Sequence, residues 1–158
     1  MDLRFAEESD LPVLMDVVNR AFAVESFFKT ADRLDEEHTR RYFREGRFLL
    51  AEEEGALLGC VFVQIHGEQA YLGLLSVAPG RQNSGLGRRL VAAAEEFARE
   101  MGAHRMELTV VNLRVELLPL YEKLGYQVVG TEAIPEEMTH RVNQPCHFIR
   151  MAKPLGNG

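Results

Sequence analysis

The chain has 158 residues, of which 46% are apolar and 27% charged, and its formal net charge is −6. These values are ordinary for one globular domain, and a chain of this length can bury a core without a metal or a disulfide framework. The negative charge disfavours nucleic acid as the main ligand, because binding to phosphates requires a surplus of lysine and arginine.

The N-terminal part of the chain predicts one strand and two helices. In order, these are a strand over Asp2–Ala6, a helix capped by Ser9 or Asp10 with Pro12 in its first turn, and a helix over Asp35–Arg44 that ends at Gly46. Apolar residues recur at helical spacing in the first helix, at Leu11, Leu14, Val18 and Ala21. The segment Glu25–Arg33 between the helices gives no clear signal.

The middle of the chain predicts three strands and a long helix. The strands cover Arg47–Glu52, Ala56–His66 and Gln69–Val77. Short charged or glycine-containing turns separate them, which is typical of a meander, and Pro79 and Gly80 end the third strand. The helix runs from about Gly85 to Met101. One face is expected to be buried, and it carries Leu86, Leu90, Ala94, Phe97 and Met101.

The C-terminal part predicts three strands and a short helix. The strands cover His104–Val111, Tyr126–Thr131 and Cys146–Lys153, and the helix covers Glu116–Leu124 and ends at Gly125. The segment Glu132–Pro145 receives no assignment. This order of elements favours an α/β fold in which helices cover both faces of a mixed sheet. We expect one domain over residues 1–155 and a flexible tail at 156–158.

Two cysteines and the N-terminal residues bear on cellular location. Cys60 and Cys146 are too few and too far apart for a disulfide framework or a zinc site, and Cys60 is expected to be a buried apolar group within Leu57–Ile65. Met1–Arg4 lacks the basic start of a signal peptide, and no apolar run approaches the roughly 18 residues of a membrane span. We therefore predict a cytoplasmic protein with no metal and no membrane partner.

A glycine-containing loop joins the third middle strand to the long helix and is the main functional signal. The first amides of a helix have no partner within it and lie at the positive end of its dipole. Gly85 and Gly87 lack a Cβ, so an anion can approach the backbone. The segment Arg81–Arg89 contains three arginines and no carboxylate. These features indicate an anion site, although a plain turn would also explain two glycines.

The two commonest phosphate loops do not fit this segment. A Walker loop needs Gly-Lys-Ser/Thr, which is absent, and the dinucleotide motif needs a third glycine where Leu90 stands. These two motifs therefore leave open which anion the loop binds and whether it is only a turn that reverses the chain.

Two motifs together resemble the GNAT superfamily of N-acetyltransferases. The signature Gln/Arg-x-x-Gly-x-Gly/Ala between the fourth strand and the following helix is matched by Gln82–Gly87. Asn83 stands where glycine is common, and asparagine tolerates left-handed backbone geometry. A second marker, Tyr-x-Lys-x-Gly-Phe/Tyr, is matched by Tyr121–Tyr126 about 35 residues later. The element order extends the resemblance over nearly the whole chain, which implies a mostly antiparallel mixed sheet of about seven strands with about four helices.

The resemblance implies that acetyl-CoA is the cosubstrate. Its pyrophosphate would contact the loop residues, and its pantetheine arm would lie between splayed fourth and fifth strands. The residues implied in this binding are Leu75, Ser76, Val77, Gln82, Asn83, Ser84, Gly85, Leu86, Gly87, Arg88 and Asn112. A backbone amide in the strand segment could polarise the thioester carbonyl. Asn112 could bond the cofactor arm or cap the next helix.

The resemblance also implies that Tyr121 is the general acid that protonates the leaving thiolate. A phenol of pKa about 10 can protonate a thiolate of pKa about 8.5 only if its position compensates. Packing at an interface is the alternative role for this tyrosine. The general base is open, with Glu68 chosen among His66, Glu68, Tyr71 and Glu107, and ordered water could replace it. Arg114 and Glu116 could line the acceptor site or form a surface ion pair.

The implied function is transfer of acetyl from acetyl-CoA to a primary amine by direct attack in a ternary complex. The acceptor could be a small molecule, an amino acid, a peptide terminus or a lysine, and other acyl groups are a close variant. A non-catalytic module that senses acyl-CoA or binds a partner is the alternative, and a nucleotide-phosphate enzyme is a third possibility. A homodimer is compatible with such a fold.

Overall fold

The computed structural model describes residues 1–29 and 32–156. Seven strands form one sheet in the order β1-β2-β3-β4-β5-β7-β6. They are β1 (Asp2–Phe5), β2 (Arg47–Glu53), β3 (Ala56–His66), β4 (Gln69–Val77), β5 (Arg105–Val111), β6 (Gln127–Ala133) and β7 (His147–Pro154). The α-helices are α1 (Leu11–Phe22), α2 (Glu36–Glu45), α3 (Leu86–Glu100) and α4 (Leu117–Lys123). The predicted fold class is confirmed, because β4 and β5 are parallel and the other neighbours antiparallel.

Three short 3-10 helices complete the described chain: η1 (Glu8–Asp10), η2 (Ala23–Phe27) and η3 (Glu136–Arg141). Of these, η3 lies in the unassigned segment Glu132–Pro145, and η2 overlaps the start of the unassigned segment Glu25–Arg33. The predicted flexible tail falls mostly on residues 157–158, which lie outside the described residues.

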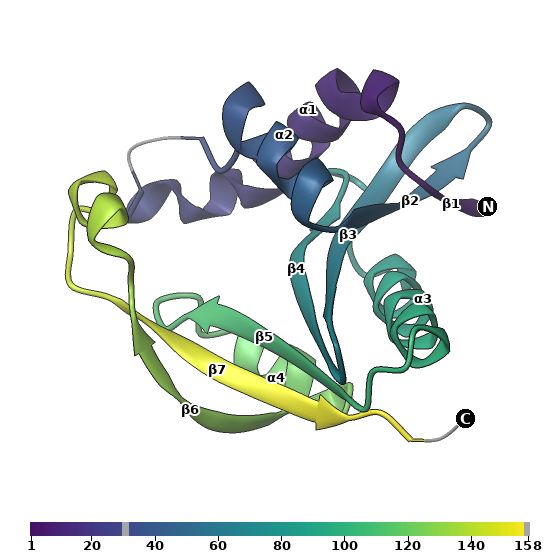
Figure 1. Cartoon of the computed structure of the whole chain (residues 1–158). Helices are drawn as coiled ribbons and strands as arrows, with labels where there is room; N and C mark the ends of the chain where they lie inside the picture. Colours follow the sequence, from purple (N-terminus) through teal and green to yellow (C-terminus); the bar gives the residue numbers. More distant parts are fainter. Residues whose placement is uncertain (30–31, 157–158) are drawn as a thin grey trace.

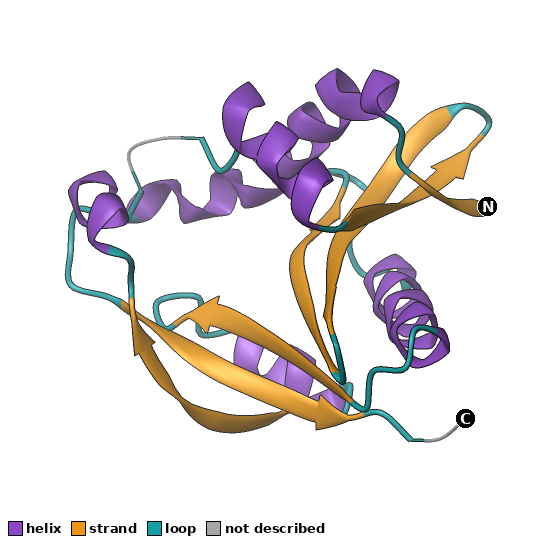
Figure 2. Ribbon diagram, viewed as in Figure 1, coloured by secondary structure: helices purple, strands orange, loops and turns teal. Residues whose placement is uncertain are grey.

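The helices cover both faces of the sheet, as predicted (Figures 1 and 2). On one face, α3 and α4 pack against the larger core, which includes Leu90, Val61, Met106 and Tyr121. On the other face, α1 and the residues around α2 pack on a second core formed by Leu14, Val18, Leu34, Phe48, Leu50, Cys60, Phe62 and Leu74. The burial of Cys60 confirms the prediction made for that residue.

Parallel strands β4 and β5 join the two halves of the sheet over a short distance. Their register contains three pairs, Gln69↔Arg105, Ala70↔Met106 and Tyr71↔Glu107. After Tyr71 the strands diverge, and Figure 1 shows β4 rising toward α1 and α2 while β5 runs to the left beside β7. The later part of β4 therefore has β3 on one side and no strand on the other.

A bulge in β4 lies at the start of this divergence. The register with β3 shifts between the pairs Phe62↔Gly73 and Cys60↔Ser76, so two residues of β4 oppose one residue of β3. Leu74 adopts a left-handed conformation with φ 53°. Before the bulge Leu72 faces the larger core, whereas after it Leu75 does. The bulge thus changes which side chains of β4 face each core.

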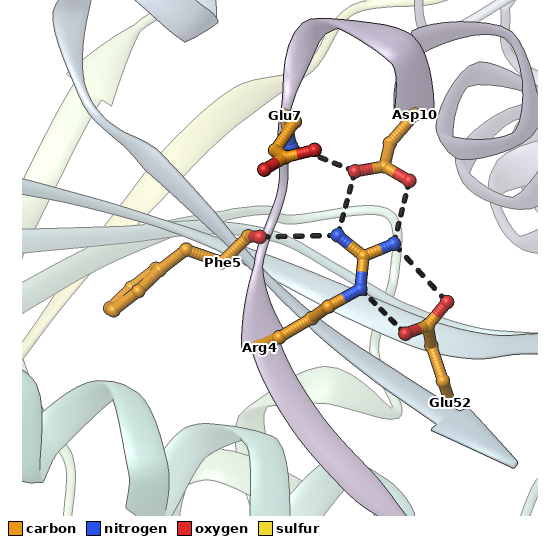
Figure 3. Close-up of polar contacts among 5 residues, drawn as sticks. All are labelled: Arg4, Phe5, Glu7, Asp10 and Glu52. Carbon is orange, nitrogen blue, oxygen red and sulfur yellow. Dashed lines mark hydrogen bonds and ion pairs between the residues drawn. The ribbon is translucent and has the colours of Figure 1, made fainter.

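Arg4 fixes the N-terminal strand at the sheet edge (Figure 3). Its guanidinium donates two hydrogen bonds to the carboxylate of Asp10, at 2.8 and 2.7 Å, and one from Nε to Glu52 at 2.6 Å. The Asp10 carboxylate also accepts the amide of Glu7 at 2.7 Å. The Arg4 guanidinium lowers the pKa of Asp10. Because its carboxylate is engaged there, Asp10 does not cap α1 with its side chain, in contrast to the sequence prediction.

Two other local predictions have different outcomes. Pro12 lies in the first turn of α1, as predicted. Met101, predicted on the buried face of the long helix, is 56% exposed because α3 ends at Glu100 and the chain turns there. Among the described residues, no helix has the length and apolar character needed to cross a membrane.

Candidate active site

The loop between β4 and α3 has the backbone geometry that the sequence suggested. Asn83 and Gly85 both adopt positive φ, 63° and 84°, so the expected left-handed tolerance of asparagine is used. The Gln82 side chain braces the loop, since its Oε1 accepts the Gly80 amide at 3.1 Å and its Nε2 donates to the Val77 carbonyl at 3.4 Å. Ser84 donates its hydroxyl to the Arg81 carbonyl.

The start of α3 presents a run of main-chain amides. The amide of Arg81 donates to Ala78 and that of Arg89 donates to Gly85. Within the described chain, no acceptor is found for the amides of residues 82–88 between them. A Cβ at Gly85 would meet no heavy atom within 4 Å, so the space in front of this backbone is open. The geometry suits an anion at the positive end of the helix dipole.

The side chains of this segment divide into two groups. Arg81, Arg88 and Arg89 are exposed and add positive charge around the loop. Leu86 is 4% exposed and packs in the larger core, so only its amide can face a ligand. The anion site is therefore made of backbone, with arginines at its rim.

The free edge of β4 connects this loop to the divergence of the strands. The Ala78 amide donates to the Leu58 carbonyl of β3 at 2.8 Å. Bonding alternates along an antiparallel pair, so the amide of Val77 is directed away from β3, and Leu75 lies in the bulge that precedes this stretch. Ser76, in register with Cys60 and 1% exposed, has its main-chain groups directed toward β3 instead. Its hydroxyl donates to the Leu74 carbonyl at 2.9 Å.

A cavity of about 530 Å³ occupies the space where β4 and β5 diverge. Residues 71–75 of β4 and 107–111 of β5 form two of its walls. Side chains near η2, from the loop before α4 and from the η3 region close the others. Because Leu75 lines the cavity and Val77 contacts the loop, β4 connects the anion site to the cavity.

Tyr121 lies on α4 and lines this cavity. It is 7% exposed, and its ring meets the edge of the Tyr126 ring at a centroid distance of 5.9 Å. Burial raises the pKa of its phenol well above the ordinary value, and Arg114 opposes this shift. Among the described residues the Tyr121 hydroxyl has no hydrogen-bond partner. A protonated, unengaged hydroxyl therefore faces the cavity.

Of the four candidate bases, two line the cavity and two lie outside it. Glu68 and His66 are exposed in or beside the turn between β3 and β4, where β4 and β5 are still paired, and neither lines the cavity. The structure therefore does not bring Glu68 near Tyr121. Tyr71 and Glu107 do line the cavity. Burial raises the pKa of Tyr71, whose hydroxyl lies 3.4 Å from that of Thr109.

Asn112 has a structural partner that the sequence did not indicate. Its Oδ1 accepts the His147 amide at 2.8 Å, and its own amide donates to the His147 carbonyl at 3.0 Å. This pair joins the end of β5 to the start of β7. Asn112 does not line the cavity, and the N-cap of α4 is Glu116.

Sequence reasoning missed a buried ionic group at the cavity wall. Glu25 of η2 accepts from Lys29 and, across 89 positions of sequence, from Arg114, both at 2.8 Å. The Arg114 side chain is only 14% exposed, so the expected surface ion pair with Glu116 is not its main contact. The spacing of Glu25 and Lys29 by four residues was the one local signal of this group.

Comparison with known proteins gives a family match over most of the chain. The model of the Acetyltransferase (GNAT) family matches residues 13–126. Streptothricin acetyltransferase of Streptomyces lavendulae is 30% identical over 80 residues, which are 51% of this chain and 42% of that protein. The chain thus spans less than half the length of this relative.

Two solved structures are similar over nearly their whole length. The ribosomal-protein-S18-alanine N-acetyltransferase from Escherichia coli has a TM-score of 0.79 and 20% identity, with 98% of this chain and 94% of that chain covered. A GNAT family acetyltransferase from Elizabethkingia anophelis with acetyl-CoA bound has a TM-score of 0.79 and 17% identity, with 98% and 97% covered. At these identities the likeness shows the fold.

Proposed function

Because this chain belongs to the GNAT acetyltransferase family, we propose that it transfers an acetyl group from acetyl-CoA to a primary amine by direct attack in a ternary complex. Acetyl-CoA supplies a thioester, whose acyl group the amine takes up while the thiolate leaves. The observation that carries the proposal is the continuous path from an amide-lined helix start, along a free strand edge, to a cavity lined by Tyr121.

The residues present fit the cosubstrate at both ends of this path. The amides of residues 82–88 have no acceptor within the described chain, and Gly85 leaves open space in front of them. We propose that they bind the pyrophosphate, with Arg88 at the rim and the Gln82 and Ser84 side chains bracing the loop. The amide of Val77 would then pair with an amide group of the pantetheine arm.

In the proposed reaction, Tyr121 donates a proton to the departing sulfur. Its raised pKa keeps the phenol protonated at neutral pH, which a general acid requires. Burial also makes a thiolate in the same cavity more basic, which offsets part of the unfavourable difference in pKa. An amide of β4 directed into the cavity would donate to the carbonyl oxygen as negative charge develops on it.

The amine must lose a proton before it attacks, and we propose that ordered water takes it. Glu107 lines the cavity, but its Oε1 already accepts hydrogen bonds from Arg105 and Arg150. Glu25 is engaged by Lys29 and Arg114. Both oxygens of Glu25 are therefore engaged, Oε2 of Glu107 has no hydrogen-bond partner among the described residues, and Glu68 lies outside the cavity.

A thiol-release assay with acetyl-CoA and a panel of amines tests this proposal. Turnover with at least one amine, together with heat of binding for CoA alone, is the expected result. Tight CoA binding without turnover on any amine would instead favour an acyl-CoA-sensing module of the same fold. Absence of CoA binding by the folded protein would overturn both.

A further inference from the structure

Two buried cations share a single carboxylate at the cavity wall. Glu25 is 5% exposed. Its Oε1 accepts from Lys29 and its Oε2 from Arg114, each at 2.8 Å, and the two cationic side chains are only 13% and 14% exposed. Both carboxylate oxygens are therefore engaged, and one positive charge is left without a buried counter-charge.

The next carboxylate does not remove this excess. Glu116 lies 3.4 Å from the Nε of Arg114, but its side chain is 58% exposed and screened by water. The buried Nε of Arg114 has no hydrogen-bond partner within the described residues. A donor of this group is thus unsatisfied in the structure as it stands.

Among the remaining charged residues that line the cavity, Arg33 and Arg150 are cations and Glu107 and exposed Glu132 are carboxylates. Arg33 lines the same wall, and its contacts are with the neutral Tyr42 hydroxyl at 3.4 Å and the Phe22 ring at 5.6 Å. On the opposite wall, Glu107 accepts from two arginines, Arg105 and Arg150. Glu25 and Glu107 thus each accept hydrogen bonds from two cations. This local arrangement contrasts with the chain's net charge of −6.

An excess of desolvated positive charge is costly unless a ligand compensates for it. Burial lowers the pKa of Lys29, and the nearby Arg33 and Arg114 contribute to this shift. The phosphates of CoA cannot supply the missing negative charge if they bind at the start of α3, because that loop does not line the cavity. A negative charge on the acceptor would compensate for this excess.

Resting on the proposed acetyl transfer, we infer that the acceptor carries a carboxylate close to the amine that is acetylated, as a free amino acid does, and that Lys29 and Arg114 bind this carboxylate. Arg114 lies in the loop that leads into α4, where Tyr121 lies, and both residues line the cavity. In an α-amino acid one carbon separates the amine from the carboxylate, so a carboxylate held by Arg114 keeps the amine near the reacting thioester.

The test compares free amino acids with their carboxamides, which keep the amine and lose the negative charge. At saturating acetyl-CoA, kcat/KM for thiol release should be about tenfold or more higher for the amino acids, as expected for one charge-assisted contact. The amine of a carboxamide has the lower pKa and is more often neutral, so this effect alone would favour the amides. A preference for the acids therefore reports recognition of the carboxylate.

Two variants locate that recognition. In Lys29→Met, Glu25 keeps Arg114 in a one-to-one pair, so the fold should persist. In this variant the ratio of kcat/KM for an amino acid to kcat/KM for its carboxamide should fall to about twofold, chiefly because KM for the amino acid rises. Arg20→Met is the matched control, because Arg20 is exposed on α1 and its one ion pair among the described residues is with exposed Asp16. Its ratio should equal that of the wild type.

Equal or faster turnover of the carboxamides by the wild type would overturn the inference and leave acetyl transfer intact. The inference would also fail if Lys29→Met kept the wild-type ratio of kcat/KM between amino acids and carboxamides. A binding measurement covers the case without turnover: calorimetry with N-acetyl amino acids and N-acetyl carboxamides in the presence of CoA. Tighter binding of the acids by the wild type but not by Lys29→Met supports the carboxylate site even if the enzyme proposal fails. Equal binding of the two ligands refutes it.

Discussion

Replacement of Gly85 by tryptophan separates binding of the cosubstrate from folding. Gly85 has φ 84° and ψ 0°, and a Cβ there would meet no heavy atom within 4 Å. The cost to the free protein is therefore the left-handed backbone alone, about 1–2 kcal/mol. For a chain of this size the Tm should fall by roughly 2–8 °C. The indole would fill the space in front of the loop amides, and CoA affinity should fall at least about 100-fold, or about 3 kcal/mol.

Gly67→Trp provides the control for this experiment. Gly67 also has positive φ, 60°, and open space around its Cβ, but it lies in the turn at the other end of β4. Thermal unfolding should show a similar loss of stability in both variants, whereas titration calorimetry should show normal CoA binding only in Gly67→Trp. If folded Gly85→Trp binds CoA with the wild-type Kd, the helix start is not the pyrophosphate site and the proposed function loses its main support.

Four further predictions concern single side chains. Tyr121→Phe should bind CoA normally and lose about 100-fold in kcat for thiol release, and a wild-type rate would exclude Tyr121 as the general acid. Because a general acid is active when protonated and burial raises the pKa of this phenol, wild-type kcat should not decline between about pH 8 and 9.5 on account of Tyr121. Glu68→Gln should leave kcat within about twofold of the wild type, since Glu68 is exposed outside the cavity, and a large loss would restore it as a candidate base. Tyr126→Phe removes the 2.8 Å hydrogen bond from the phenol to buried Glu95 and should lower the free energy of unfolding by about 1.5–3 kcal/mol in urea denaturation; an unchanged value would show that this bond contributes nothing net.

Features that depend on residues near one another in the chain could be predicted from the sequence. Apolar spacing and turn residues predicted β3 (Ala56–His66) and β4 (Gln69–Val77) with their observed bounds and the other elements within a few residues. The glycine loop could be predicted as an anion site because its chemistry comes from consecutive amides at one helix start. Asn83 could be predicted to suit the loop because left-handed tolerance is a property of the residue itself.

The parts of the site that join distant segments could not be predicted before the fold was known. Local pattern gives no register, so neither the bulge at Leu74 nor the divergence of β4 from β5 could be derived from periodicity. Asn112 meets His147 because β7 inserts between β5 and β6, and Glu25 meets Arg114 because η2 packs beside the loop before α4. Such contacts arise from the packing of whole elements, in which the burial of two cores outweighs local preference. For that reason the sequence indicated where the cosubstrate would bind, whereas the charges around the acceptor became visible only in the folded chain.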